Sequence, residues 1–108
     1  MRWKGVCKLA LQLPEVEEGT AYGVPALQVR GGLVARLLDD KKSILVKVDL
    51  RQRATLCATK PETFSITRET EPYAVMVVRL ARLGPAELWP VLVESWRRSA
   101  PPDLASTF

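Results

Sequence analysis

Three short strand-like runs, separated by turns and not by helices, constrain the fold more than any other feature. They cover residues 20–30, 33–38 and 43–48. The first two are joined through Gly31-Gly32, and such a pair suits the left-handed dihedrals of a tight hairpin. The polar residues 39–42 form the second link. The sequence therefore predicts a three-stranded antiparallel meander.

Helical spacing appears on both sides of this meander. Apolar residues recur through residues 2–13, which predicts an amphipathic helix that ends before Pro14. The acidic residues 15–19 follow as a predicted loop. A second helix is predicted over residues 50–59, where Asp49 is a suitable N-cap.

The C-terminal half adds two strands and a last helix. Strands are predicted at residues 64–66 and 73–80, and a helix opens at Pro85 with apolar residues at helical spacing. The predicted fold is therefore α+β, in the order α-β-β-β-α-β-β-α. An antiparallel sheet of about five strands, with helices packed on one face, fits this order best.

Length and composition indicate one domain. The chain has 108 residues, of which 47% are hydrophobic, as in ordinary globular proteins. We predict a single domain over residues 1–102. Pro101-Pro102 ends regular structure, so residues 103–108 are predicted as a loose tail.

The chemistry-bearing residues are few. The chain has no histidine, which excludes nucleophiles activated by one. Cys7 and Cys57 are predicted as buried free thiols, and two cysteines fall short of the roughly four ligands of structural zinc. The clustered acids Glu15, Glu17 and Glu18 are interpreted as a solvated loop. We expect no enzymatic activity, no cofactor and no bound metal.

The charge balance is basic but moderate. Sixteen basic and twelve acidic residues leave a net charge of +4, which is compatible with a polyanionic partner and does not establish one. The chain also lacks asparagine, and arginine outnumbers lysine. This composition fits a heat-adapted source, or a bias in genomic base composition.

Targeting signals are not evident. Lys8 interrupts the apolar core that a signal peptide would need, and no apolar run approaches the roughly 20 residues of a membrane span. We therefore expect a cytoplasmic protein without a membrane partner.

Several segments, taken in order and spacing, resemble a known family. They are residues 13–27, 33–37, 45–49 and 60–64, then Tyr73 with residues 77–80, and Glu87-Leu88 with Trp96. Together they closely resemble the MmcQ/YjbR family of small bacterial proteins over about residues 6–101. The resemblance implies a compact α+β fold similar to secretion-chaperone-like and frataxin-like domains.

The family resemblance also suggests a function. Members are often described as predicted DNA-binding proteins with a double-wing motif, a description that carries no established base-reading residues. This sequence departs from the family at residues 68–72, where His or Gly with an aromatic is usual. Here that connection holds Glu69 and Glu71, which makes it less suited to phosphate contact.

A basic row is predicted on one face of the sheet, because successive side chains of a strand alternate between faces. One face is expected to hold Val34, Arg36 and Leu38 from one strand, Leu45 and Lys47 from the next, and Val75, Val77 and Arg79 from the last. If no helix covers that face, Arg36, Lys47 and Arg79 form a cationic row, with Arg30 at the hairpin tip. Such a row can hold the phosphates of duplex DNA, weakly and with strong salt dependence.

Other interpretations remain open at this point. The basic row is also compatible with a half-solvated face whose charges pair with nearby acids. Its apolar neighbours instead suit a protein partner, a chaperone-like adaptor role or a homodimer. A second basic group near the middle helix is interpreted as a solvated helix face: Arg51, Arg53 and Lys60. Three aromatic residues are interpreted as core: Trp3, Tyr22 and Trp96.

Overall fold

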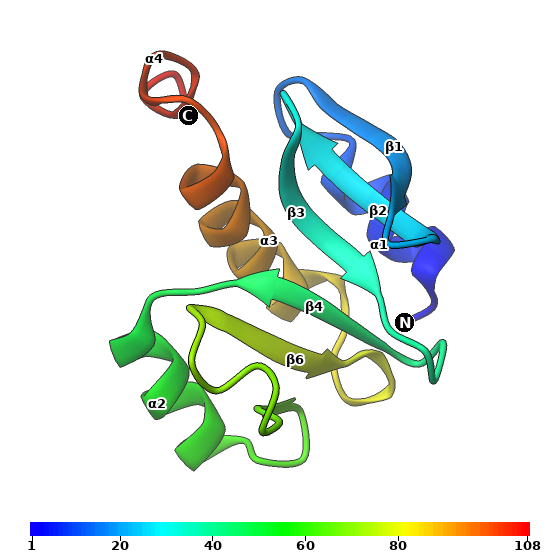
Figure 1. Cartoon of the computed structure of the whole chain (residues 1–108), viewed down its shortest axis with the longest axis vertical. Coiled ribbons are helices and arrows are strands. Elements are labelled where there is room, and N and C mark those ends of the chain that lie inside the picture. Colours follow the sequence, from blue (N-terminus) through cyan, green and yellow to red (C-terminus); the bar gives the residue numbers. More distant parts are fainter.

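The computed structural model describes all 108 residues and contains one six-stranded antiparallel sheet (Figure 1). The sheet order is β1-β2-β3-β4-β6-β5. The strands are β1 (Val16–Ala21), β2 (Val24–Val29), β3 (Gly32–Leu37), β4 (Ser43–Lys47), β5 (Phe64–Ser65) and β6 (Val75–Arg79). The helices are α1 (Trp3–Ala10), α2 (Leu50–Thr59), α3 (Pro85–Ser99) and α4 (Pro102–Ala105), with a 3-10 turn at Leu80–Arg82.

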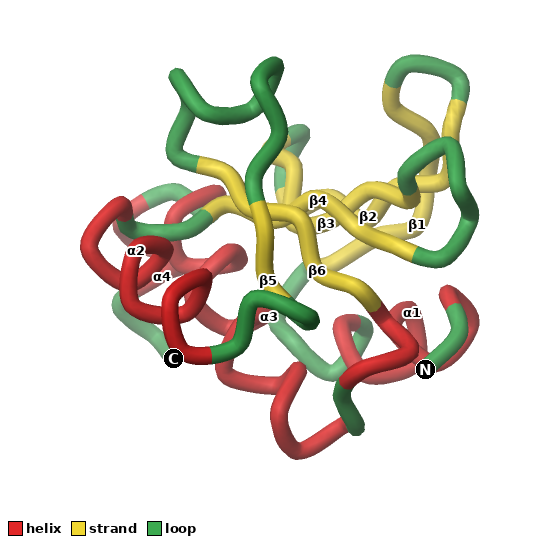
Figure 2. Tube along the Cα trace, turned by 90° about the horizontal axis from the view of Figure 1, so that it is seen from below, coloured by secondary structure: helices red, strands yellow, loops and turns green.

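All the helices lie on one side of the sheet, as the edge-on view in Figure 2 shows. Helix α3 packs across the middle strands β3 and β4, while α1 packs against α3 and α2 against β5 and β6. The other side carries no helix, and loops rise from it (Figure 2). The predicted α+β fold with helices on one face is thus confirmed, and this second side is called the open face.

The core lies between the sheet and the helices. Strand register brings Ala35, Val46 and Met76 side by side, and Leu37, Ile44 and Val78 beside them, on the helix-covered side. The fully buried Trp96 of α3 completes this layer, and its indole N–H donates to the Pro14 carbonyl at 2.9 Å. The prediction that Trp96 belongs to the core is confirmed, while Trp3 is half-buried at its edge.

The N-terminal hairpin differs from its prediction. Of the acidic residues expected as a loop, Glu17 and Glu18 belong to strand β1, which pairs with β2 as far as Ala21 and Val24, whereas Glu15 precedes the strand. Tyr22 and Gly23 form the two-residue turn, and both have positive φ, as a type I′ turn requires. The β2–β3 hairpin has the same kind of two-residue turn, formed by Arg30 and Gly31 at positive φ. This turn lies one residue earlier than the predicted Gly31-Gly32 turn. Strong turn geometry therefore overrode the low β-propensity of the glutamates.

Helix α2 forms as predicted, over residues 50–59. The Asp49 carboxylate accepts the backbone N–H groups of Arg51 and Gln52 at 3.0 and 3.2 Å, which confirms it as the N-cap. No residue of this helix is fully buried.

The C-terminal residues are ordered, in contrast to the expected loose tail. Helix α4 buries Leu104, and the Phe108 ring meets Trp89 and Trp96 edge to face at 6.1 and 5.6 Å. Pro102 is the first residue of α4, a position that proline favours, so this short helix starts soon after α3 ends.

Candidate functional site

Arg36 lies near the middle of the open face. Its register partners are Leu45 of β4 and, one strand further, Val77 of β6, so the three side chains form a row across three strands. Arg36 and Val77 are half-buried, whereas Leu45 is 6% exposed. The sequence pattern had placed these three residues on one face, and the register agrees.

Lys47 and Arg79 flank this row at opposite ends of the strands. Lys47 pairs with Val75, and Arg79 pairs with Ser43. The two cations are therefore four residues apart along the strands and one strand apart across them, a separation of roughly 14 Å between Cα atoms. None of the four ion pairs in the structure involves Arg36, Lys47 or Arg79.

Val34 does not belong to the open face, contrary to the strict alternation assumed from the sequence. Leu27 pairs with Ala35 but the next residue, Gln28, pairs with Leu33, so Val34 is one extra residue in β3. This β-bulge turns the fully buried Val34 toward α3, and its carbonyl accepts the Ser95 hydroxyl. The same hydroxyl accepts the backbone N–H of Lys47 at 3.0 Å.

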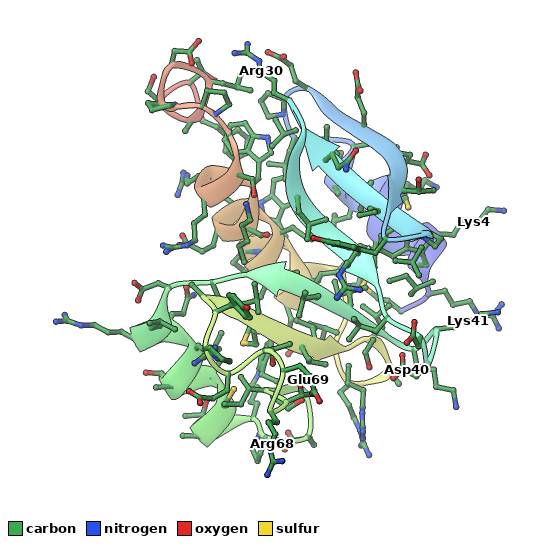
Figure 3. All side chains as sticks on the ribbon, viewed as in Figure 1. Lys4, Arg30, Asp40, Lys41, Arg68 and Glu69 are labelled. Atoms are coloured by element: carbon green, nitrogen blue, oxygen red, sulfur yellow. The ribbon has the colours of Figure 1, made fainter.

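Arg30 lies apart from the other three cations, at the far end of the molecule beside α4 (Figure 3). Its guanidinium donates to both carboxylate oxygens of Glu15 at 2.9 and 2.8 Å and lies 3.6 Å from Asp103. The hydrogen bond and charge of Arg30 lower the pKa of Glu15, so the pair stays ionised. The charge of Arg30 is thus already compensated within the protein.

Further cations lie beside Lys47 and beside Arg79. Lys47 shares a shallow hollow of about 540 Å³ with Arg97 and Arg98, at the end of α3. Arg98 pairs with Glu94 at 3.6 Å, and the Arg97 guanidinium donates to the main-chain oxygen of the last residue, Phe108, at 3.2 Å. At the other end, a hollow of about 590 Å³ is lined by five residues, Asp40, Lys42, Arg79, Ala81 and Arg82.

Asp40 contributes one negative charge to that second hollow, against the three cations Lys42, Arg79 and Arg82. Its carboxylate accepts the backbone N–H groups of Lys42 and Ser43, both at 2.9 Å, and the Ser43 hydroxyl. These hydrogen bonds, led by that from Lys42, lower the pKa of Asp40. Asp40 therefore acts mainly in shaping the β3–β4 turn.

The basic group predicted near α2 has a structural role that the sequence did not reveal. The Arg53 guanidinium donates to the carbonyls of Tyr73, Val75 and Glu71 at 2.6, 3.0 and 3.1 Å. Lys60 pairs with Glu87 of α3 at 3.1 Å. Only the exposed Arg51 fits the solvated helix face predicted for all three. The contact of Arg53 with three backbone carbonyls could not be predicted, because no sequence pattern marks a carbonyl as a hydrogen-bond partner.

A groove of about 460 Å³ crosses the open face. One wall is Tyr22 of the β1–β2 turn, and the other comes from the loop 66–74, through Glu69, Thr70 and Tyr73. Leu33, Arg36, Leu45 and Val75 line the rest. The groove is called the tyrosine groove below. Tyr22, predicted as core, is 91% exposed because turn residues project away from the sheet.

Groups suited to covalent chemistry or metal binding are scarce. Burial, with a further contribution from Glu18, raises the pKa of the Cys7 thiol to about 11. Burial also raises the pKa of Cys57, which is half-buried and not fully buried as predicted. No three His, Cys, Asp or Glu side chains lie together as a metal site would require. None of the helices combines the length and apolar character needed to cross a bilayer.

Comparison with known proteins identifies the family. The sequence model of the YjbR family matches residues 11–98, which is most of the chain. The chain belongs to the YjbR family. The resemblance predicted from the sequence is therefore confirmed. No curated protein sequence matches the chain significantly.

A solved structure shares the YjbR-family fold seen here. It is the crystal structure of the Deinococcus radiodurans protein DR2400, which carries a DUF419 domain. The two structures superpose with a TM-score of 0.76 at 15% sequence identity, over 90% of this chain and 77% of the other. At this identity the similarity shows a common fold alone.

Proposed function

We propose that this chain is a binding module without catalytic activity, which holds duplex DNA weakly and without sequence preference on its open face. The observation that carries the proposal is the set of cations there without acidic partners. Arg36, Lys47 and Arg79 lie on the face itself, and Lys42 and Arg82 extend the set at one end, beside Arg79. Phosphate contacts of this kind supply essentially all non-specific DNA binding.

The same residues support a binding role over a catalytic one. In the tyrosine groove the Thr70 hydroxyl is hydrogen-bonded to Thr67 of its own turn and not to Glu69, and Cys7 is buried with a raised pKa. The net charge of +4 favours association with a polyanion. The description of YjbR-family members as predicted DNA-binding proteins with a double-wing motif points in the same direction.

The test is a titration of a labelled mixed-sequence duplex of about 20 base pairs, followed by fluorescence anisotropy from about 50 mM salt upward. Five phosphate contacts predict a slope of log K against log salt of about −4.5. The triple variant R36Q/K47Q/R79Q should flatten that slope by up to about three units. Absence of binding at tens of micromolar protein in about 50 mM salt would overturn the proposal.

A matched control separates the open face from net charge. The variant K4Q/K8Q/R51Q also removes three exposed cations, but they lie on the helices α1 and α2 on the other side of the sheet. It should leave the salt slope nearly unchanged. Equal flattening in both variants would mean that overall charge, and not the open face, attracts DNA.

A second candidate function is association with a protein or with another copy of this chain. The exposed apolar residues beside the open face favour it, since Ile66 is 41% and Tyr73 65% exposed. Val77 then becomes the central contact, because Val34 is buried and unavailable. Val77→Lys should abolish self-association in sedimentation velocity, whereas R36Q/K47Q/R79Q should leave it nearly unchanged.

A further inference from the structure

Tyr22 occupies a position where a bulky side chain is uncommon. It is the first residue of the β1–β2 turn and has φ 54°, a region that Asn, Asp and Gly favour. Its ring is nevertheless the most exposed large apolar side chain of the protein, at 91%. An exposed aromatic at a strained position contributes little to the core, so its presence calls for another explanation.

Arg36 fixes one face of this ring. The guanidinium carbon lies 5.6 Å from the centre of the Tyr22 ring, a cation–π distance. Because the ring is otherwise exposed, a second planar group has room to stack on Tyr22 beside Arg36. The arginine therefore orients the ring and also places a positive charge at the mouth of the tyrosine groove.

Arg53 fixes the opposite wall. Its three hydrogen bonds go to the carbonyls of Glu71, Tyr73 and Val75, and they hold the backbone of the loop that carries Tyr73. The Tyr73 side chain is not engaged by these bonds and is 65% exposed. Both walls of the groove thus present an aromatic ring whose backbone is held in place.

The floor of the groove decides which kind of ligand fits. Leu33, Leu45 and Val75 are apolar and come from strands that are paired on both sides within the sheet. An extended peptide therefore finds no free backbone edge to pair with. Glu69 on the wall disfavours a phosphate inside the groove. A flat, mostly apolar ring satisfies all these conditions, with its charged part outside near Arg36 and Lys47.

We propose that the tyrosine groove accepts an unpaired nucleobase, held between the rings of Tyr22 and Tyr73, while the flanking phosphates lie on the cations of the open face. The chain then binds single-stranded nucleic acid in preference to a fully paired duplex. Stacking on an aromatic side chain tolerates any base, so no sequence preference follows. This inference rests on the proposed function, because the phosphate contacts hold the strand over the groove.

The experiment compares two labelled probes of equal length in about 50 mM salt: a fully paired duplex and a single strand. The wild-type chain should bind the single strand roughly tenfold more tightly than the duplex, the effect of about one stacked base. Tyr22→Asn should remove most of that preference and change duplex affinity by less than about twofold. Asn suits the positive φ of this turn, so the variant keeps the hairpin.

Two further variants test the stacking itself. Tyr22→Phe keeps the aromatic face and should retain the single-strand preference, whereas Tyr73→Ala should lower it roughly tenfold. Circular dichroism checks that each variant is folded. Loss of the preference in Tyr22→Phe would point to the hydroxyl and overturn the stacking geometry.

The outcomes separate this inference from the proposed function. If the duplex binds as tightly as the single strand and Tyr22→Asn alters neither, the inference is wrong while the DNA-binding proposal stands. If neither probe binds, both are wrong. If Tyr22→Asn weakens self-association in sedimentation velocity and leaves oligonucleotide affinity unchanged, the groove is a protein surface.

Discussion

The two faces of the sheet are built from the same strands but differ in composition and in role. On the helix-covered side, Ile44, Val46, Met76 and Val78 are completely buried. Their immediate neighbours in β4 and β6 face the other way and include half-buried valines and two cations. One step along a strand therefore separates a residue that stabilises the fold from one that is free to serve a ligand.

The helix-covered side also contains the completely buried hydroxyl of Ser95, which has two hydrogen-bond partners. No buried side-chain nitrogen or oxygen lacks a hydrogen bond. The open face has the opposite character, because its cations have no acidic partner and its tyrosines are exposed. Unpaired cations beside exposed tyrosine rings thus distinguish the open face, which is the side we assign to binding.

The sharpest test of this comparison uses two neighbouring residues of β6. Met76→Ala should lower the free energy of unfolding by about 2–5 kcal/mol, because it leaves a cavity under the helices. Val77→Ala, on the open face, should lower it by less than about 1 kcal/mol. Urea denaturation measures both. Similar losses for the two variants would mean that the open face is covered in solution.

The next effect concerns the hydroxyl that joins α3 to the sheet. Ser95→Ala leaves the Val34 carbonyl and the Lys47 N–H without their partner in a buried site. We expect a loss of about 2–3 kcal/mol in unfolding free energy, since each unpaired buried group is costly. The end of α3 also lies close to β3, since a Cβ added to Gly32 would lie 2.7 Å from the Ser99 carbonyl oxygen. A loss below about 0.5 kcal/mol would show that water replaces the hydroxyl.

A smaller effect should appear as pH dependence. The Cys7 pKa is raised to about 11 in the folded chain, whereas an unfolded thiol titrates near its ordinary value of about 8.5. Between these values the folded state holds the extra proton, so stability falls as pH rises. We expect a decrease of about 1–2 kcal/mol between pH 9 and 11, measured by urea denaturation. Cys7→Ala should remove that part of the decrease, and an unchanged slope would contradict the burial of the thiol.

Much of the fold follows from local signals in the sequence. Asp49 and the helix after it were predictable because an N-cap and a stop signal, here Lys60-Pro61, act within a few residues. The alternation of β4 and β6 correctly placed Lys47 and Arg79 on one face with Arg36. The family resemblance followed from several matching segments, which the comparison confirms over residues 11–98.

What the sequence could not predict depends on contacts between distant residues. The bulge at Val34 breaks the alternation, and it is recognised only through the pairing of β3 with β2 and the Ser95 hydroxyl. The convergence of three carbonyls on Arg53 requires the folded loop. Tyr22 is different, because the Tyr22-Gly23 pair is itself a local turn signal. Residues 20–30 were nevertheless predicted as one continuous strand, with the only hairpin turn at Gly31-Gly32.

The smallest expected effect is the stability change in the triple variant R36Q/K47Q/R79Q. No ion pair is lost, because none of the three cations has an acidic partner. Arg36 gives up its contact with the Tyr22 ring, worth about 0.5–1 kcal/mol at an exposed site.

Relief of repulsion adds little to that change. Lys47 and Arg79 are roughly 14 Å apart, beyond the Debye length of about 8–10 Å at ordinary salt. The variant should therefore unfold within about 1 kcal/mol of the parent chain in urea. That result would separate a loss of DNA affinity from a loss of folding. A destabilisation above about 2 kcal/mol would instead assign these side chains to the structure, and the two faces of the sheet would no longer differ in role.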